Sequence, residues 1–310
     1  MELRHLRYFV AVAEEKHFTR AAKVLGIGQP PLSQQIQQLE RELGTALFHR
    51  LPRGVSLTPA GQALFDDARR VLREAEQAVE RTRRVARGEQ GRLRVGMINS
   101  APFHPLVPRV IREFRRRYPE VALTLEERTT PGLAAAVLNE TVDVAFVRPL
   151  LDTPEGLCSE HVLDEPLLAA LPAGHPLARR KALPLMALSL EPFVLFPRAV
   201  GAGLHDVIVR ACHAAGFSPR VVQEASQVTS IVNLVAAGMG VSIVPASMQQ
   251  LHIEGVRYRA IQGLAALARL DLVYRAADRE LPQILNLRRL TARLSAGAGA
   301  AAAGPPERPG

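Results

Sequence analysis

Cysteine is scarce in this sequence, and long apolar runs are missing. The 310 residues include 2 cysteines, Cys158 and Cys212, which lie far apart and outside any C-x-x-C or metal-ligand spacing. Reduced structural thiols are therefore the expected state, and a redox pair is the lesser alternative. No apolar stretch approaches the roughly 20 residues that a membrane-spanning helix needs, so no membrane partner is expected.

Export and enzyme signatures are missing as well. The first residues, MELRHLRYFV, lack the uninterrupted apolar core of a signal peptide, so we expect a cytoplasmic protein rather than a secreted solute-binding protein. No G-x-S-x-G, phosphate-binding loop or H-E-x-x-H occurs, and the histidines are scattered without metal spacing. We therefore expect no catalytic residue, no metal site and no cofactor.

Positive charge is in excess. The formal net charge is +9, which favours an anionic partner but does not distinguish nucleic acid from a membrane surface or an acidic ligand. The length allows two or three domains with sizeable cores.

The most informative segment is PPLSQQIQQLEREL, residues 30–43. Its apolar residues recur at helical spacing and form one stripe that faces a core: Leu32, Ile36, Leu39 and Leu43. The opposite face collects neutral amides and a guanidinium: Pro30, Gln34, Gln37, Gln38 and Arg41. Gln can bond an adenine edge and Arg can bond guanine or phosphate, so this face suits a DNA major groove. Taken alone, the segment is equally consistent with a Gln-rich surface helix.

The preceding residues favour the DNA-binding interpretation. Residues 19–25 predict a short helix capped by Thr19, and Gly26 begins a tight turn. Pro30 and Pro31 fall where a helix start tolerates missing N–H groups, and Gly44 ends the second helix. This order of elements predicts a helix-turn-helix.

The flanking segments complete a small domain. Residues 3–13 predict an amphipathic helix that packs behind the other two. Residues 46–57 fit a two-stranded wing, with Arg50 and Arg53 placed beside DNA phosphates. Thr58 followed by Pro59 predicts the start of a further helix.

That further helix is expected to be long and to pair with a second copy. A heptad seam runs through residues 59–87: Leu64, Ala68, Val71, Ala75, Ala78, Thr82 and Val85. A small winged domain cannot bury a seam of this length, so we expect a C2 dimer that presents two recognition helices to two half-sites.

These motifs resemble LysR-type transcriptional regulators. The resemblance rests on LRHLRYFVAVAEEKHFTRAAKVLGIGQPPLSQQIQQLERELGTALFHR and on LTPAG at residues 57–61, and it covers the whole N-terminal domain. One position departs from the common pattern, because Gln34 stands where many members have Arg. We assign the DNA contacts to these residues: Thr19, Gln29, Pro30, Pro31, Ser33, Gln34, Gln37, Gln38, Arg50 and Arg53.

The remaining chain changes rhythm near residue 91, where short apolar strands begin to alternate with helical patterns, as in parallel α/β units. We expect strands at residues 93–98, 121–127, 142–147, 193–196, 220–224, 241–244 and 270–274. The resemblance implies two α/β lobes like those of periplasmic binding proteins, with an effector cleft between them.

The expected fold class is thus α+β and multidomain. The expected divisions are a winged helix-turn-helix (1–58), a dimerising linker helix (59–90), an effector domain (91–295) and a disordered Ala/Gly/Pro tail (296–310). Within the effector domain, we expect lobe I at about 91–163 and 268–295 and lobe II at about 164–267.

Polar residues at expected strand ends and helix starts mark the effector site, because helix N-termini offer free N–H groups to anions. We assign it to Asn99, Ser100, Thr129, Thr130, Arg148, Gly203 and Gln227. Two alternatives stay open: Ser100 and Thr130 as simple helix caps, and Arg148 as the partner of an acid.

A finer resemblance concerns the effector. The N-terminal segments and AAGMGVSIVPAS at residues 236–247 are similar to the subgroup that regulates benzoate, catechol and chlorocatechol breakdown, whose effectors include cis,cis-muconate. The resemblance implies double-stranded operator DNA, a small carboxylate effector, RNA polymerase and further copies of the chain, as a dimer and then a tetramer, as partners. The alternative is a regulator of another pathway with a non-aromatic effector.

Overall fold

The computed structural model describes residues 1–150 and 152–302. Two compact units make up the chain, Met1–Arg84 and Val85–Gly310. Among the described residues, no helix is long and apolar enough to cross a membrane.

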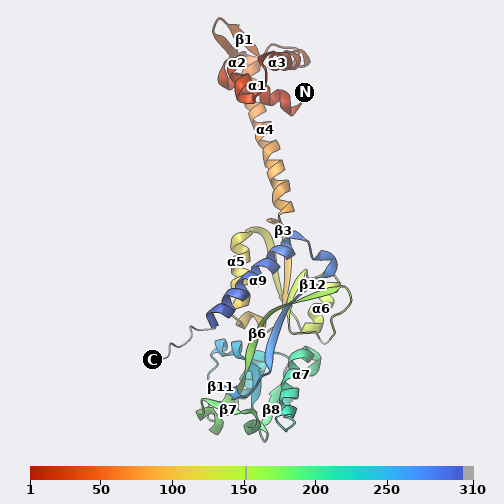
Figure 1. Cartoon of the computed structure of the whole chain (residues 1–310), viewed down its shortest axis with the longest axis vertical. Helices are drawn as coiled ribbons and strands as arrows, with labels where there is room; N and C mark the ends of the chain where they lie inside the picture. Colours follow the sequence, from red (N-terminus) through yellow and green to blue (C-terminus); the bar gives the residue numbers. More distant parts are fainter. Residues whose placement is uncertain (151, 303–310) are drawn as a thin grey trace. The chain divides into compact units, whose positions relative to one another are not determined.

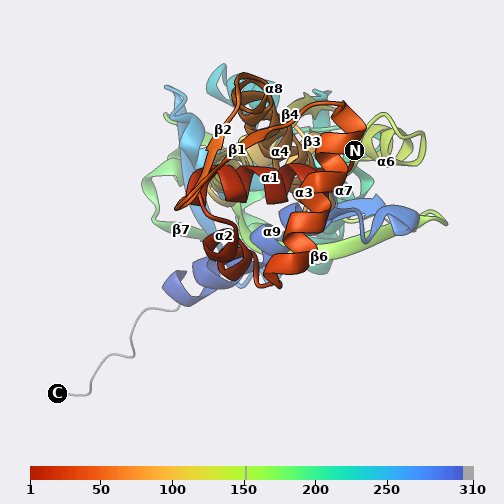
Figure 2. The same cartoon turned by 90° about the horizontal axis from the view of Figure 1, so that it is seen from above.

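The first unit is a winged helix-turn-helix that continues into a long helix, as predicted. Its elements are α1 (Leu3–Glu15), α2 (Phe18–Leu25), α3 (Gln29–Leu43), β1 (Phe48–Leu51), β2 (Gly54–Leu57) and α4 (Pro59–Ala86). Figures 1 and 2 show α1, α2 and α3 packed together beside the β1–β2 hairpin. Phe9, Leu32 and Leu39 are fully buried in their shared core.

Local chemistry explains the helix ends, with one correction. Gly26 (φ 68°) and Gly44 (φ 67°) end α2 and α3 in the left-handed conformation that favours glycine. The cap of α2 is His17, whose Nδ1 accepts the Thr19 N–H at 3.2 Å. The prediction that Thr19 is the cap is therefore wrong, because the helix begins one residue earlier and Thr19 lies in its first turn.

The apolar stripe of α3 is confirmed except at its end. Leu32, Ile36 and Leu39 are buried, whereas Leu43 is 40% exposed. Leu43 is the last residue of α3 and lies beyond the edge of the small core. The Glu40 carboxylate accepts the Leu47 N–H at 2.8 Å, which ties α3 to the start of the wing.

Thr58 fixes the start of α4. Its Oγ1 donates to Ala46 O at 2.8 Å and accepts the Gly61 N–H at 2.9 Å, so the predicted Thr-Pro start is confirmed. Farther along the helix, the heptad seam is uncovered in a single chain, with Val71 40% and Val85 53% exposed.

The second unit is built on a mixed sheet. Its first elements are β3 (Gln90–Met97), η1 (Ala101–Phe103), α5 (Leu106–Arg117), β4 (Glu120–Glu127), α6 (Thr130–Leu138), β5 (Val144–Val147), β6 (Leu157–Pro172), η2 (Pro176–Arg179), β7 (Ala182–Pro184) and η3 (Leu185–Leu188). Then follow β8 (Pro192–Leu195), α7 (Arg198–Ala214), β9 (Arg220–Glu224), α8 (Val228–Ala236), β10 (Ser242–Pro245), η4 (Ala246–Leu251), β11 (Val256–Gln262), β12 (Leu267–Arg275), η5 (Ala276–Asp278) and α9 (Pro282–Ala302).

Two lobes share this sheet, as the fold class predicts. The strand order is β4-β3-β5-β12-β6-β11-β7, with β10 paired to β6, and β8 and β9 form a separate pair. One hydrophobic core includes Phe114 and Phe146, and a second includes Leu171 and Phe193. Figure 1 shows β6 and β12 running from the group around β3, α5 and α9 to the group around β7, β8 and α7.

The predicted strands are present, but β6, β7 and β11 were not anticipated. The 16-residue β6 passes from one core to the other, so its burial pattern changes along its length and no single alternation marks it. The expected tail also needs correction, because α9 continues to Ala302 and residues 296–302 are helical. Alanine is the strongest helix former, which favours a helix in this alanine-rich stretch. The rest of that tail, residues 303–310, lies outside the described residues.

Candidate DNA-binding surface and effector cleft

The predicted DNA-contacting residues lie on one helix start, one exposed helix face and the wing. Gln29, Pro30 and Pro31 form the first turn of α3, while Thr19 is exposed on α2. Ser33 is half-buried and accepts a bond from the Gln29 amide at 3.0 Å. These residues surround the amide face of α3.

The glutamines of α3 differ in their freedom to bond a base. The Gln38 amide donates to Glu42 at 3.3 Å. Gln34 and Gln37 are exposed, and their side chains make no hydrogen bond within the described part of the chain. Gln34 and Gln37 are therefore the amides most readily available for base readout.

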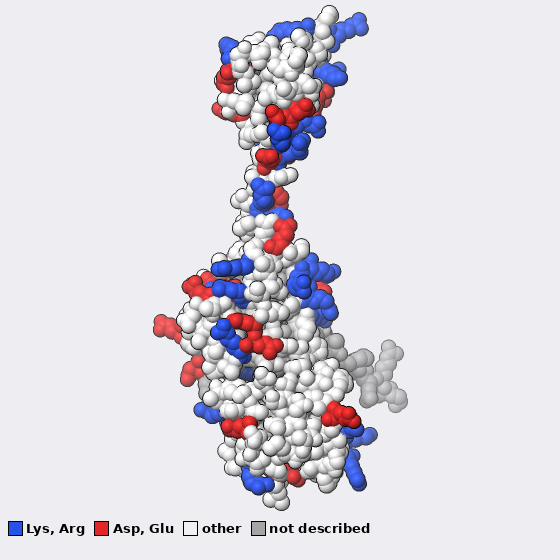
Figure 3. Space-filling view, turned by 180° about the vertical axis from the view of Figure 1, so that it is seen from behind, with Lys and Arg blue, Asp and Glu red and all other residues white. Residues whose placement is uncertain are grey.

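The wing carries exposed positive charge. Arg50 lies on β1 and Arg53 in the turn before β2, and both are exposed. Neither makes an ion pair among residues 1–150 and 152–302. Figure 3 shows basic side chains at the end of this unit where Figure 1 places β1. Phosphate contact by these arginines positions a protein on DNA without reading sequence.

The effector domain holds a small cleft between its lobes. It is lined by Ile98, Asn99, Ser100, Arg128, Thr129, Thr130, Arg148, Phe196, Val200, Gly201, Leu204, Ser226 and Val228. Five predicted effector residues are thus brought together, and no carboxylate lines the cleft. Its volume of about 40 Å³ has room for only a few water molecules.

Two of the effector predictions are displaced by a residue or two. Gly203 packs against the backbone of Pro149, where an added Cβ would lie 2.4 Å from the carbonyl oxygen. Gly201, at the kink in α7, lines the cleft instead. Gln227 is the N-cap residue of α8, but its side chain makes no cap hydrogen bond, and its neighbours Ser226 and Val228 line the cleft. The sequence pattern located these helix starts but did not show which residue of each first turn faces the cleft.

The structure shows which of the hydroxyl residues in the cleft cap a helix. Thr129 caps α6, because its Oγ1 accepts the Gly132 N–H at 3.3 Å. Thr130 is the first residue of α6, is buried and makes no side-chain hydrogen bond within the described residues. Ser100 is 3% exposed and does not cap η1; its Oγ accepts from Arg148 Nη2 at 3.4 Å. The capping alternative is therefore wrong for both Ser100 and Thr130.

Arg148 pairs with an acid, which is the alternative role that the sequence left open for it. Its Nη2 lies 3.0 Å from Glu165 Oε1, and the two side chains are 4% and 6% exposed. Nη1 donates to Ala268 O at 2.9 Å and to Arg269 O at 3.0 Å. Glu165 Oε2 accepts the Ser247 N–H at 2.8 Å. This network joins both lobes at the crossing strands.

Three features of the cleft and its surroundings were not predicted from the sequence. Arg128 lines the cleft and directly precedes the predicted Thr129, so its position beside a predicted helix start was an available signal. Glu165 gave no such signal, because its partner is 17 residues away. Asn99 Nδ2 donates to Ser226 O at 3.4 Å across the cleft, a contact between residues 127 apart.

His104 lies close to this buried ion pair. Burial lowers the pKa of His104 below its ordinary value of 6.5; Glu165 opposes this shift, and Arg148 adds to it. Its Nδ1 accepts the Leu106 N–H at 3.2 Å, a bond that the protonated ring cannot accept at Nδ1. The neutral ring is therefore the form that suits the fold.

His104 is expected to make the domain acid-sensitive. Its pKa is lower in the folded chain than in the unfolded chain, so the unfolded state binds the extra proton and stability falls as pH drops below 6.5. His104→Asn keeps a hydrogen-bond acceptor without titrating and should weaken this dependence. Urea midpoints at neutral pH and at about pH 5.5 measure it. The same variant at the exposed His252 is the control, and an unchanged pH dependence in His104→Asn would contradict the assignment.

No group of His, Cys, Asp and Glu within the described residues could hold a metal ion. Cys212 is buried and Cys158 partly so, and both are free thiols. Burial raises the pKa of the Cys212 thiol to about 11. Cys212 is thus a poor nucleophile at neutral pH.

Comparison with known proteins gives the family. "Bacterial regulatory helix-turn-helix protein, lysR family" matches residues 3–62, and "LysR substrate binding domain" matches residues 86–295. The chain is 41% identical over 288 residues to the uncharacterized HTH-type transcriptional regulator YnfL of Escherichia coli K12, covering 93% of this chain and 97% of that protein. It is 40% identical over 279 residues to the regulator BudR of Raoultella terrigena, covering 90% and 96%.

Solved structures agree. The crystal structure of CbnR, a LysR family transcriptional regulator, matches with a TM-score of 0.82 and 30% identity, covering 94% of this chain and 100% of that one. Full-length CbnR in complex with its target DNA matches with a TM-score of 0.77 and 30% identity, covering 95% and 100%. The chain therefore belongs to the LysR family of DNA-binding transcriptional regulators.

Proposed function

We propose that this regulator responds to a small carboxylate, of the cis,cis-muconate class, and controls genes for the breakdown of aromatic compounds. The observation that carries the proposal is the lining of the cleft: the N-termini of α6 and α8 and the Ser100 hydroxyl, with no acidic side chain among the lining residues. Arg128 also lines the cleft, and its Nη2 lies 3.0 Å from Glu126 Oε2. Helix N-termini favour anions, and two helix N-termini from opposite lobes suit a dicarboxylate.

Thermal unfolding of the full chain with candidate acids tests the effector. A ligand at one hundred times its dissociation constant stabilises a one-site protein by roughly 2.7 kcal/mol, so a clear rise in Tm is expected with cis,cis-muconate. Ser100→Ala with Thr130→Ala should abolish that rise, because both hydroxyls face the carboxylate. Thr124→Ala, on the exposed surface of β4, is the matched control.

The outcomes separate the alternatives. A rise only with an acid that does not arise in aromatic breakdown would favour a regulator of another pathway. No rise with benzoate, muconate, chlorinated muconates or salicylate would refute an effector from aromatic breakdown, while the family assignment would stand on its own grounds.

We further propose that Gln34 reads a base edge and that Arg53 contacts phosphate. Gln34→Ala should reduce discrimination at one base pair by about 1–3 kcal/mol, whereas Arg53→Ala should weaken binding to all sequences and reduce the salt slope by about 1. Fragments selected from random DNA by the wild-type chain serve as probes across a salt series. Gln249→Ala, far from the helix-turn-helix in sequence and exposed, is the control. A change of sequence preference in Arg53→Ala would contradict its role.

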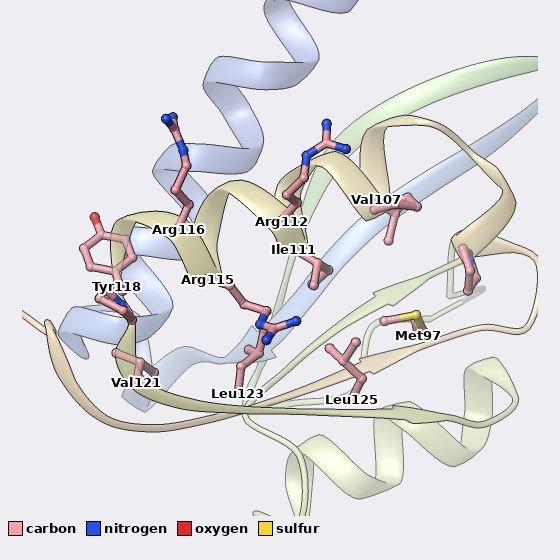
Figure 4. A pocket seen from close by; sticks show the side chains of 13 residues that line it. Met97, Val107, Ile111, Arg112, Arg115, Arg116, Tyr118, Val121, Leu123 and Leu125 are labelled. Carbon is pink, nitrogen blue, oxygen red and sulfur yellow. The ribbon is translucent and has the colours of Figure 1, made fainter.

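The assembly we propose is a dimer through α4 and a tetramer through the effector domains. A groove of about 790 Å³ lies between α5 and β4, the edge strand of the sheet. In Figure 4, Val107 and Ile111 of α5 point toward Met97 and Leu125 on the sheet.

A second copy of the chain can supply the covering surface. The β9 edge exposes Val221 (41%) and Val222 (47%), which suit an apolar groove beside an edge strand. Two copies can each offer β4 and β9 to the other in a two-fold arrangement.

The mechanism follows from these parts. Effector binding changes the position of one lobe relative to the other. This change alters the spacing of the paired helix-turn-helix units on several half-sites. The bend of the DNA then changes, and with it the contact with RNA polymerase.

A further inference from the structure

A second hollow in the effector domain lies between the end of α5 and α9. It is lined by Arg117, Tyr118, Asn286, Arg289, Leu290 and Arg293 and has a volume of about 190 Å³. None of these residues lines the effector cleft. The hollow is therefore a separate feature of lobe I.

The core fixes the two helices that carry the three exposed arginines. Arg289 and Arg293 share one face of α9, because they lie about one helical turn apart. Arg117 is the last residue of α5, and Phe114 and Leu290 of the two helices are buried in one core. The centroids of the Tyr118 and Phe114 rings lie 4.9 Å apart, so Tyr118 packs against the core beside Arg117.

Three arginines line this hollow: Arg117, Arg289 and Arg293. Two neighbouring arginines have acidic partners, since Arg116 lies 2.6 Å from Glu113 and Arg288 bonds Glu160. Arg117, Arg289 and Arg293 make no ion pair in the part of the chain that the structure describes. No carboxylate lines the hollow. Its positive charge is therefore left for a ligand.

We propose that this hollow binds a small anion with two or more negative charges, as a phosphate ester or a polycarboxylate. The arginine fork matches phosphate and carboxylate oxygens bidentately. Sites for drug-sized molecules have volumes of roughly 300–1,000 Å³, so a hollow of about 190 Å³ suits a compact anion.

The site also touches the segment that follows the linker helix. Asn286 Nδ2 donates to Arg87 O at 2.9 Å, and Gln283 Nε2 donates to Gln90 O at 2.8 Å. An added Cβ on Gly88 would lie 2.7 Å from Pro282, so the two segments are in close contact. An anion bound beside Asn286 acts directly on the residues that connect α4 to the sheet. This gives the regulator an input that does not depend on the cleft.

Isothermal titration calorimetry of the full chain tests the proposal, with pyrophosphate and citrate as probes at constant ionic strength. We expect saturable binding at one site per chain, weakened at least about tenfold by Arg289→Gln with Arg293→Gln. Arg179→Gln with Arg180→Gln removes the same charge from exposed positions in lobe II and should leave binding unchanged.

The two probes separate the chemistries. Binding of pyrophosphate alone would identify a phosphate site, and binding of citrate alone a carboxylate site. Absence of saturable binding by either probe, or equal weakening by both double variants, would overturn the proposal. Loss of muconate response has no bearing on this result, so its failure and that of the cleft proposal are distinguishable.

Discussion

Replacing Arg148 with alanine is expected to lower the free energy of unfolding of the effector domain by about 3–5 kcal/mol. The substitution leaves Glu165 buried at 6% exposure, with the Ser247 N–H as its remaining partner. It also removes the bonds to Ala268 O and Arg269 O at the crossing strands. An uncompensated buried carboxylate is far less stable than one in water, so the loss exceeds that of an ordinary surface pair.

Urea unfolding followed by tyrosine fluorescence measures this loss, because Tyr118, Tyr258 and Tyr274 lie in the second unit. Arg198→Ala is the matched control, since Arg198 pairs with Asp206 at 2.7 Å while 60% exposed. Its effect should be much smaller. Arg148→Met combined with Glu165→Leu should recover much of the stability, because no buried charge remains. Equal losses in Arg148→Ala and Arg198→Ala would contradict the role of the buried pair.

Sequence reasoning succeeded where the cause of structure is local. The stripe of Leu32, Ile36 and Leu39 is set by helical spacing, and Gly26 and Gly44 end their helices through their own backbone conformation. It failed at Leu43, because the extent of the core is set by other elements.

The cleft shows the same division. Hydroxyl residues after predicted strands led to Ser100 and Thr130, which the structure brings together. Their surroundings were beyond prediction, because Arg148 meets Glu165 only when β6 crosses between the lobes. Likewise, the kink at Gly201, which turns this residue rather than Gly203 into the cleft, depends on how α7 packs.

The uncovered seam of α4 leads to the second large expected effect. Ala78→Asp should disrupt pairing of two α4 helices. Each chain then places a carboxylate in the apolar seam, where it faces the same carboxylate of the other chain. Ala78 is exposed in the single chain, so the substitution leaves the fold of one copy intact. Without the α4 pair, the two DNA-binding domains bind their half-sites independently. Linking two binding domains raises affinity by about 10²–10⁴. Binding to DNA with two half-sites should therefore fall at least about 100-fold.

Gln77→Asp provides a closely matched control. It adds the same charge and the same side chain one position earlier in α4, about 100° around the helix and away from the seam. Mobility-shift titrations compare the two variants on DNA selected by the wild-type chain, and sedimentation velocity measures their assembly. If both variants bind this DNA with equal affinity, α4 does not form the dimer, and the half-sites are then joined by another surface. If only Ala78→Asp loses affinity while binding to a single half-site is unchanged, the seam acts by pairing the two recognition helices rather than by shaping either one.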